Sequence, residues 1–199
     1  MNNQHNKLAL FRLRKRGWMR MVFALIIALD LFSAALPAHA EPAISEYKVK
    51  ALFLVNFAKY VDWPAEAFKD TNAPITIGIV GKDRFGGELD KIIEGKTVNG
   101  RSFVIKHINA NDEWTGCQIL FISHSEAARA GEILGKTGTL PVLTVGEDSA
   151  FEQKDGMVTF MLKNEKVRLE INLAPANKCG LKISSRLLAV ADVVKGKAD

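Results

Sequence analysis

The clearest pattern in the chain is a run of apolar positions between Tyr47 and Pro64 that repeats at the spacing of an α-helix. Ser45 precedes the run as an N-cap residue, and the proline ends it because the residue before a proline disfavours helical geometry. The other face also carries Val55, so the helix is apolar almost all the way round. We expect it to be covered on both sides, either wholly within its own domain or by a partner chain on one side. The residues assigned to its main apolar face are Val49, Leu52, Phe53, Asn56, Phe57 and Tyr60.

Short β-branched runs follow this helix and predict a sheet. Strands are expected over residues 75–80, 103–108, 119–122 and 141–145, and a hairpin over 157–162 and 167–172. Helices are expected over residues 85–94, 123–134 and within 181–194. The middle helix has a capping box, with Ser123 as N-cap and Glu126 as its partner, and a stop at Gly135. This order predicts a single α/β domain with a mostly parallel sheet, helices on both faces, a C-terminal β-hairpin and a terminal helix.

The first forty residues, 1–40, have the layout of a secretory signal peptide. A basic segment precedes an apolar run over residues 21–36, and a small-x-small tripeptide ends at Ala40. A transmembrane anchor is the rival interpretation, but the run is short and contains Asp30. We therefore expect cleavage near Ala40, export to the periplasm, and a mature domain over residues 41–199.

Removing this segment changes the charge of the working protein. The whole chain has 27 Lys and Arg against 22 Asp and Glu, and residues 1–40 hold six basic residues and one acidic residue. Residues 41–199 therefore carry 21 charges of each sign. A nucleic-acid partner is not expected, because binding nucleic acid requires a basic surface.

Two cysteines, Cys117 and Cys179, remain in the mature domain. Exported proteins meet an oxidising compartment, so the pair forms either a disulfide or two separate buried thiols. A bridge would close a loop of about sixty residues and stabilise the fold by roughly 4 kcal/mol in the chain-entropy model. The two cysteines do not form a CxxC motif, which disfavours a redox enzyme.

Three features invite a catalytic or ligand-binding interpretation, and each has a simpler structural one. The glycines after the first strand match no nucleotide-binding fingerprint, so an ordinary turn is expected. His107 has no second ligand at metal-binding spacing. Ser123, His124 and Ser125 are adjacent, an arrangement that seldom permits proton transfer, and they lack a nucleophile-elbow motif. We therefore expect no catalytic residue, no metal, no cofactor and no enzyme activity.

Several segments of the mature chain together match the sequence motifs of a known protein family. They are Tyr47–Leu54, Asn56–Val61, Trp63–Pro64, Cys117–Ser123, Leu143–Val145, Val167–Asn172 and Gly180–Leu188. In these segments the chain resembles the YfiR/HmsC-like family of Gram-negative periplasmic proteins. The resemblance covers nearly all of the mature chain, and its first and last motifs are the most specific.

This resemblance implies a periplasmic α/β domain that is often a homodimer. It implies a repressor that binds the periplasmic sensor domain of an inner-membrane diguanylate cyclase. It also implies that an outer-membrane lipoprotein can sequester this repressor. The output would be a lower cyclic-di-GMP level and hence an effect on biofilm formation. Redox control through cysteines is less expected, because Cys179 stands where no general family cysteine is expected.

Two surfaces are candidates for binding. A docking protein would use the exposed side of the first helix, where we expect partner contacts near Val55, Lys59 and Asp62. The alternative is a periplasmic small-ligand-binding domain, whose ligand would lie at the carboxyl ends of the strands. The residues at those ends are Gly81, Ser123 and Gly146.

Overall fold

The structure is a computed structural model that describes residues 45–109, 112 and 114–194. The expected signal peptide, residues 1–40, lies outside the described residues and stays a prediction. Within the described part of the chain, no helix is both long and apolar enough to cross a membrane.

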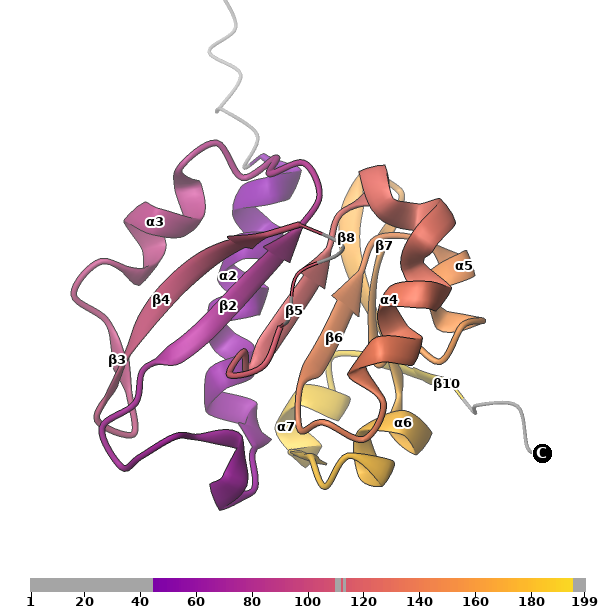
Figure 1. The fold of residues 1–199 in the computed structure, drawn as a ribbon. Helices are drawn as coiled ribbons and strands as arrows, with labels where there is room; N and C mark the ends of the chain where they lie inside the picture. Colours follow the sequence, from indigo (N-terminus) through magenta and orange to yellow (C-terminus); the bar gives the residue numbers. More distant parts are fainter. Residues whose placement is uncertain (1–44, 110–111, 113, 195–199) are drawn as a thin grey trace, which may run out of the picture. The chain divides into compact units, whose positions relative to one another are not determined.

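Eight strands of the described residues form one sheet (Figure 1), whose neighbouring strands run in the order β10-β8-β7-β6-β5-β2-β4-β3. Five neighbours, from β4 across to β7, are mutually parallel, and the β7–β8 and β3–β4 pairs are antiparallel. The chain order reverses between β2 and β5, as in doubly wound folds. The strand bounds are β2 Ile75–Val80, β3 Thr97–Val98, β4 Arg101–Ile108, β5 Ile119–Ile122, β6 Leu143–Gly146, β7 Val158–Lys163, β8 Lys166–Asn172 and β10 Asp192–Val194.

Helices cover both faces of the sheet, as the sequence predicts (Figure 1). On one face, helix α2 (Glu46–Tyr60) and α3 (Glu88–Ile93) enclose the larger apolar cluster, which also takes residues from α6 (Leu173–Lys178) and α7 (Ser185–Leu188). On the other face, the smaller cluster lies under the 3₁₀ segment η2 (His124–Arg129), α4 (Ala130–Thr137) and α5 (Ser149–Glu152). A two-stranded ribbon of β1 (Val61–Asp62) and β9 (Lys182–Ile183) follows α2, and the short η1 (Ala65–Ala67) comes after it.

The continuous apolar runs of the central strands follow from this double cover. In β2, Ile75, Ile77 and Ile79 point into the α2-side cluster, whereas Val80 belongs to the α4-side cluster. Both sets are buried, so neither face of the strand needs polar side chains. The sequence prediction of a fully buried strand over residues 75–80 is confirmed.

The β7–β8 hairpin is also confirmed, with a tight turn at its tip. Lys163 pairs with Lys166, so only Asn164 and Glu165 lie in the loop. Both loop residues have positive φ, at 51° and 60°. Two successive positive φ values define the hairpin turn whose twist matches the flanking strands.

The helix expected over residues 123–134 differs in both its start and its end. The backbone carbonyl of Ser123, not its hydroxyl, accepts the Glu126 amide at 2.8 Å, so the chain starts a 3₁₀ turn and the capping box does not form. The α-helix runs through Gly135 to Thr137 and ends at Gly138, whose φ is 52°. The expected stop at Gly135 is therefore wrong.

The terminal helix is much shorter than the apolar pattern suggested. It is the single turn α7, capped by the Ser184 hydroxyl, which accepts the Leu187 amide at 3.4 Å. The chain then forms β10, because Asp192–Val194 pairs in parallel with the end of β8. Pairing with a sheet edge thus overrides local helix propensity.

Gly78 allows close packing in the α4-side core, and this generates a prediction. A Cβ at this position would lie 2.7 Å from Ile108 Cδ1 and 3.1 Å from Cys117 Sγ. Gly78→Ala should lower the free energy of unfolding in urea by about 1–3 kcal/mol, because the core would be overpacked. Gly135→Ala is the matched control: its Cβ meets nothing within 4 Å, and alanine favours a helix, so stability should hold or rise. Equal stability of Gly78→Ala and the wild-type protein would contradict this packing.

Candidate functional site

A buried ionic cluster fixes the N-terminal half of α2 to the sheet. Glu147 follows β6 directly, and its side chain is only 3% exposed. It accepts hydrogen bonds from Tyr47 Oη at 2.7 Å, Lys50 Nζ at 2.6 Å and the His124 amide at 2.8 Å. Lys50 also pairs with Glu46 one turn earlier in the helix. The cluster therefore joins α2, the end of β6 and the start of η2.

Tyr47 is half-buried at the edge of this cluster. Burial raises the pKa of the Tyr47 hydroxyl far above its usual value, and the hydrogen bond to Glu147 raises it further. Tyr47 thus stays a neutral donor at any physiological pH. The Lys50 ammonium lies 4.6 Å from the centre of the Tyr47 ring, where the ring face attracts a cation.

A second buried group, Gln118, fixes the segment that follows α2. Its side chain accepts the Thr76 amide at 2.7 Å and donates to the Ala67 carbonyl at 2.6 Å. The Gln118 carbonyl in turn accepts the Trp63 indole N–H at 3.1 Å. The Glu147 cluster fixes the start of α2, and the Tyr60 carbonyl at its end accepts the Ser184 amide at 2.8 Å, so the outer face of α2 is presented as a rigid surface.

The outer face of α2 is the one that the sequence pattern assigned to the core. Leu52 is 39% exposed, and Val49, Phe53, Asn56 and Tyr60 are half-buried. The core instead takes the opposite face, with Ala51, Leu54, Val55 and Ala58, together with Phe57, the one residue of the predicted face that is fully buried. We call the outward residues Val49, Leu52, Phe53, Asn56, Lys59 and Tyr60 the α2 stripe.

The expected partner contact at Val55 is corrected by this orientation. Val55 is 3% exposed and belongs to the α2-side core, so it cannot meet a partner in the folded protein. Lys59 and Asp62, the other two expected contact residues, are exposed. The physical reason is that Ala51 and Ala58 have small side chains, which let this face of the helix approach the sheet closely.

The apolar surface continues from the α2 stripe onto the β7–β8 hairpin. The Phe53 ring lies 6.1 Å from the Phe160 ring. Two residues further along β7, on the same face of the strand, Leu162 is 58% exposed and pairs with half-buried Val167. Exposed apolar residues on two neighbouring elements form a contiguous patch, the usual mark of a protein-binding surface.

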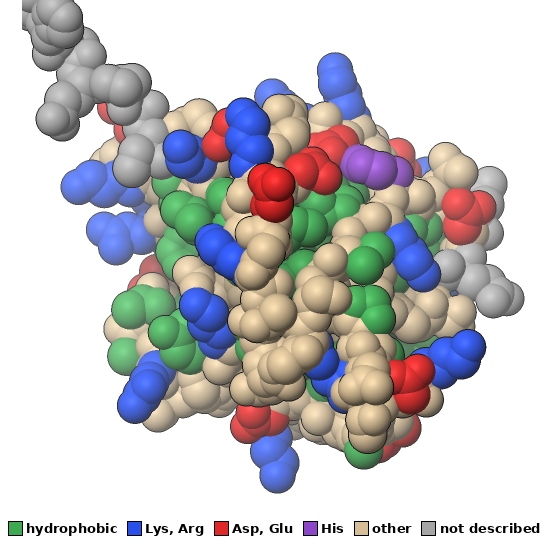
Figure 2. Space-filling view, turned by 90° about the vertical axis from the view of Figure 1, so that its left-hand side faces the viewer, with side chains coloured by type: hydrophobic (Ala, Val, Ile, Leu, Met, Phe, Trp, Pro, Cys, Tyr) green, Lys and Arg blue, Asp and Glu red, His purple; other side chains and the backbone are tan. Residues whose placement is uncertain are grey.

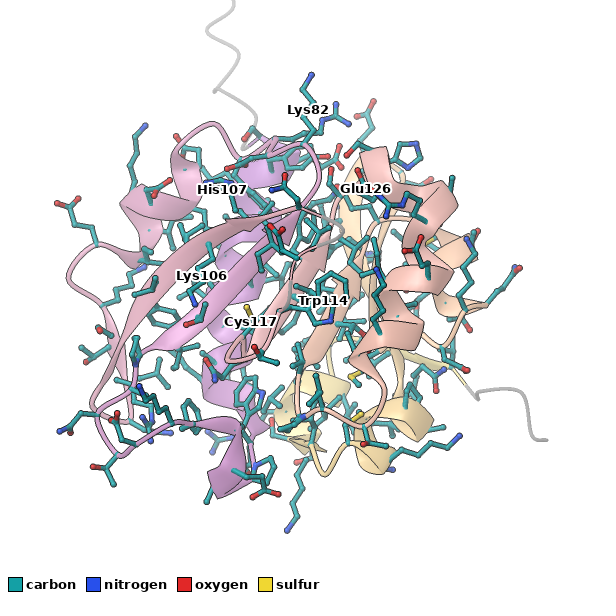
Figure 3. The ribbon with its side chains drawn as sticks, in the orientation of Figure 1. Lys82, Lys106, His107, Trp114, Cys117 and Glu126 are labelled. Atoms are coloured by element: carbon teal, nitrogen blue, oxygen red, sulfur yellow. The ribbon has the colours of Figure 1, made fainter. Side chains whose placement is uncertain are left out.

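A second exposed surface, which the sequence did not reveal, lies on the other face of the sheet at β4. In the described part of the chain, the connection from β4 to β5 contains no helix, so this half of the sheet lacks the cover that α4 gives to β5 and β6. Figure 3 shows Lys106 on β4 beside Cys117 and Trp114. Val104 on the same face of β4 is 39% exposed. Figure 2, viewed from the β3–β4 edge, shows apolar side chains among interspersed basic and acidic ones.

The two cysteines are free buried thiols, and the possible disulfide between Cys117 and Cys179 does not form. Cys117 packs in the α4-side cluster and Cys179 in the α2-side cluster. The two thiols therefore pack in different apolar clusters. Burial raises the pKa of each thiol, which keeps both protonated and poorly nucleophilic.

The Ser123, His124 and Ser125 run is not assembled as a nucleophilic site. The Ser123 hydroxyl is buried without a partner among the described residues. His124 is mostly exposed, with Nδ1 3.4 Å from Asp148. His107 lies 3.8 Å from Asp83 at the surface. Among the described residues, no group of three metal-ligating side chains is found.

Side chains fill the carboxyl edge of the strands, where a small ligand was the alternative expectation. Ser125 Oγ accepts the Lys82 amide at 2.9 Å, and a Cβ on Gly81 would lie 2.5 Å from that oxygen. Figure 3 shows Lys82 and Glu126 at this end of the sheet. At Gly146, the Phe151 ring occupies the corresponding space. The edge near Gly81 and Gly146 is therefore packed with side chains.

The buried cluster generates a stability prediction. Glu147→Ala would leave the Lys50 ammonium and the Tyr47 hydroxyl without their shared acceptor, and should destabilise the fold by about 3 kcal/mol. Urea denaturation measures this change. Glu132→Ala removes an exposed carboxylate that pairs with Arg129 and Lys136, and should change stability little. Equal effects of the two substitutions would show that the Glu147 cluster does not hold α2.

Comparison with solved structures supports the fold. A crystal structure of a conserved domain protein from Vibrio cholerae O1 biovar El Tor strain N16961 matches with a TM-score of 0.50 and 11% sequence identity. The match covers 75% of this chain and 60% of that chain, so this protein spans less than two thirds of its structural neighbour. At this identity the likeness shows the mixed α/β fold alone. No curated protein matches the sequence.

Comparison with protein families is more specific. The model of the YfiR/HmsC-like family matches residues 47–192, which includes α2, the whole eight-stranded sheet except the end of β10, and the β1–β9 ribbon. The family is one of periplasmic regulators associated with diguanylate cyclase signalling. The match covers well over half of the chain, and the protein therefore belongs to the YfiR/HmsC-like family.

Proposed function

We propose that this protein is a periplasmic negative regulator that binds the periplasmic sensor domain of an inner-membrane diguanylate cyclase. Binding lowers cyclic-di-GMP output and so reduces biofilm formation. The same proposal includes two further points. The regulator forms a homodimer, and an outer-membrane lipoprotein sequesters it. Family membership supports it, and the α2 stripe is the observation in the molecule that carries it.

The α2 stripe has the composition of a docking surface. Leu52, Phe53 and Tyr60 offer apolar and aromatic area, and the exposed Lys59 lies beside them. Protein interfaces place such anchors at their centre and polar groups at the rim. The revised contact residues are therefore Leu52 and Phe53 in place of Val55, with Lys59 and Asp62 at the rim.

Regulation by docking needs little energy. A regulator that binds the inactive state of the sensor domain more tightly shifts the cyclase toward that state. A differential of about 1–3 kcal/mol changes the active population roughly 5- to 150-fold. Burying one or two half-exposed apolar side chains supplies a differential of this size.

Leu52→Glu tests the docking surface. The side chain is 39% exposed, so stability should change by only about 0.5 kcal/mol, whereas a charge at the centre of the interface should weaken repression about tenfold or more. The measurement is the cellular cyclic-di-GMP level in a deletion strain complemented with each variant, with periplasmic protein levels checked by immunoblot. Deletion should raise the level and the wild-type gene should restore it.

Two substitutions at similar exposure serve as controls. Val104→Glu, on the bare part of β4, and Leu140→Glu, in the loop before β6, replace side chains that are 39% and 37% exposed. Both should repress as the wild-type protein does. Loss of repression by Val104→Glu, with Leu52→Glu fully active, would move the docking surface to β4. A deletion that leaves cyclic-di-GMP unchanged would overturn the proposed function itself.

Val55→Glu should behave differently from Leu52→Glu. Val55 is buried among apolar side chains, so a carboxylate there has no partner and should destabilise the fold by about 3 kcal/mol or more. Circular dichroism and urea denaturation measure the loss. A stably folded Val55→Glu protein that fails to repress would restore Val55 as a contact residue.

A small-ligand-binding role is the second candidate function. It is compatible with repression if the ligand tunes the regulator. The observation that favours it is a cavity between α4 and α6, away from the carboxyl edge where the sequence placed it.

A further inference from the structure

A cavity of about 640 Å³ opens between α4 and α6. It lies between α4, the turn that follows α5, and α6, above the first residues of β6 and β7. Its volume is within the range of small-molecule sites in proteins. No residue of the α2 stripe lines the cavity, so the cavity is separate from the proposed docking surface.

Two buried polar side chains at the cavity offer hydrogen-bond donors. Asn172 is 2% exposed, and its side-chain oxygen accepts the Ala174 amide at 3.1 Å as the N-cap of α6. Its amide nitrogen has no partner among the described residues. The Thr144 hydroxyl oxygen accepts the Met157 amide at 3.2 Å, so its hydroxyl proton can still be donated. The Asn172 nitrogen is not among the fully buried unpaired atoms of the described residues, so it is accessible from the cavity that Asn172 lines and can donate to a ligand oxygen there.

The walls combine bare backbone with apolar side chains. Gly131 and Gly135, one turn apart on α4, line the cavity, and a Cβ on Gly135 would meet nothing within 4 Å. Leu134, Met157 and Pro175 add apolar surface. These walls suit a ligand with a flat or methyl-bearing apolar side.

The charges at the cavity cancel. The charged lining residues are two acidic ones, Glu152 and Asp155, and two basic ones, Lys154 and Lys178. Lys154 Nζ donates a hydrogen bond to the Ala127 carbonyl at 3.0 Å, so one of the two basic side chains already has a protein partner. The balance favours an uncharged ligand over a phosphate or a carboxylate.

Cys179 does not make the cavity a reactive site. Its thiol lies 3.6 Å from the Gly138 carbonyl, to which it donates. Burial raises the pKa of this thiol, so the group is a neutral donor.

We infer that this cavity binds an uncharged, hydroxyl-rich ligand of monosaccharide size that carries an amide, an N-acetylated sugar. The amide carbonyl accepts from Asn172 and Thr144. The acetyl methyl contacts Leu134 and Met157, and the ring hydroxyls meet the polar rim. The same group occurs as a free sugar and as a unit of a glycan chain.

The test is isothermal titration of the purified protein with N-acetylglucosamine, its trisaccharide, glucose and glucosamine. N-acetylglucosamine should bind, and glucose, which lacks the amide, and glucosamine, which is a cation, should bind about tenfold more weakly or not at all. Tighter binding of the trisaccharide assigns the site to a glycan chain, and tighter binding of the monosaccharide to a free sugar. No binding of either acetylated probe overturns the inference.

Two variants locate the site. Asn172→Asp keeps the oxygen that caps α6 but replaces the donor with an acceptor, so affinity should fall about tenfold or more with the fold retained. Gly135→Leu projects a side chain from a helical position and should abolish binding without loss of stability. Unchanged affinity in Gly135→Leu would place the sugar elsewhere and overturn the inference. Neither result bears on repression, which the α2 variants test.

Discussion

The contact on which the rest of the molecule depends is the one between Glu147 and Lys50. It joins residues 97 positions apart in sequence, and it brings together a helix and the end of a central strand. Tyr47 and the His124 amide share the same carboxylate, so removal of that group would free three donors at once. A buried pair of this kind does not add much net stability over apolar packing, but it fixes one orientation of α2.

That fixed orientation explains how a helix with two apolar faces is used. The side with Ala51 and Ala58 lies against the sheet, and the side with Leu52 and Phe53 faces outward. The aromatic contact from Phe53 to Phe160 joins the outward side to the hairpin. At the other end of the helix, the Tyr60 carbonyl accepts the Ser184 amide. The result is a rigid apolar surface on an exported protein of a regulatory family.

The sequence predicts the sheet well and the orientation of α2 poorly, for physical reasons. Ile75–Val80 is a continuous apolar run that fits only a doubly covered strand, so it is recognised locally. In α2 both faces are apolar, so periodicity cannot decide which side is buried, and small residues at 51 and 58 were the available signal. Ser123 and Glu126 have the sequence of a capping box, but the Ser123 backbone carbonyl, and not its hydroxyl, accepts the Glu126 amide. The cavity lined by Asn172 is formed by elements that are distant in sequence, so no local sequence pattern predicts it.

The central claim is that the outward side of α2 is the surface that meets the cyclase. The most direct measurement places a photo-crosslinking amino acid at position 52 or at position 104, exposed to the same degree on opposite faces of the sheet, in cells that make the cyclase. We expect a crosslink to the cyclase from position 52 and none from position 104. A crosslink from position 104 alone would contradict it.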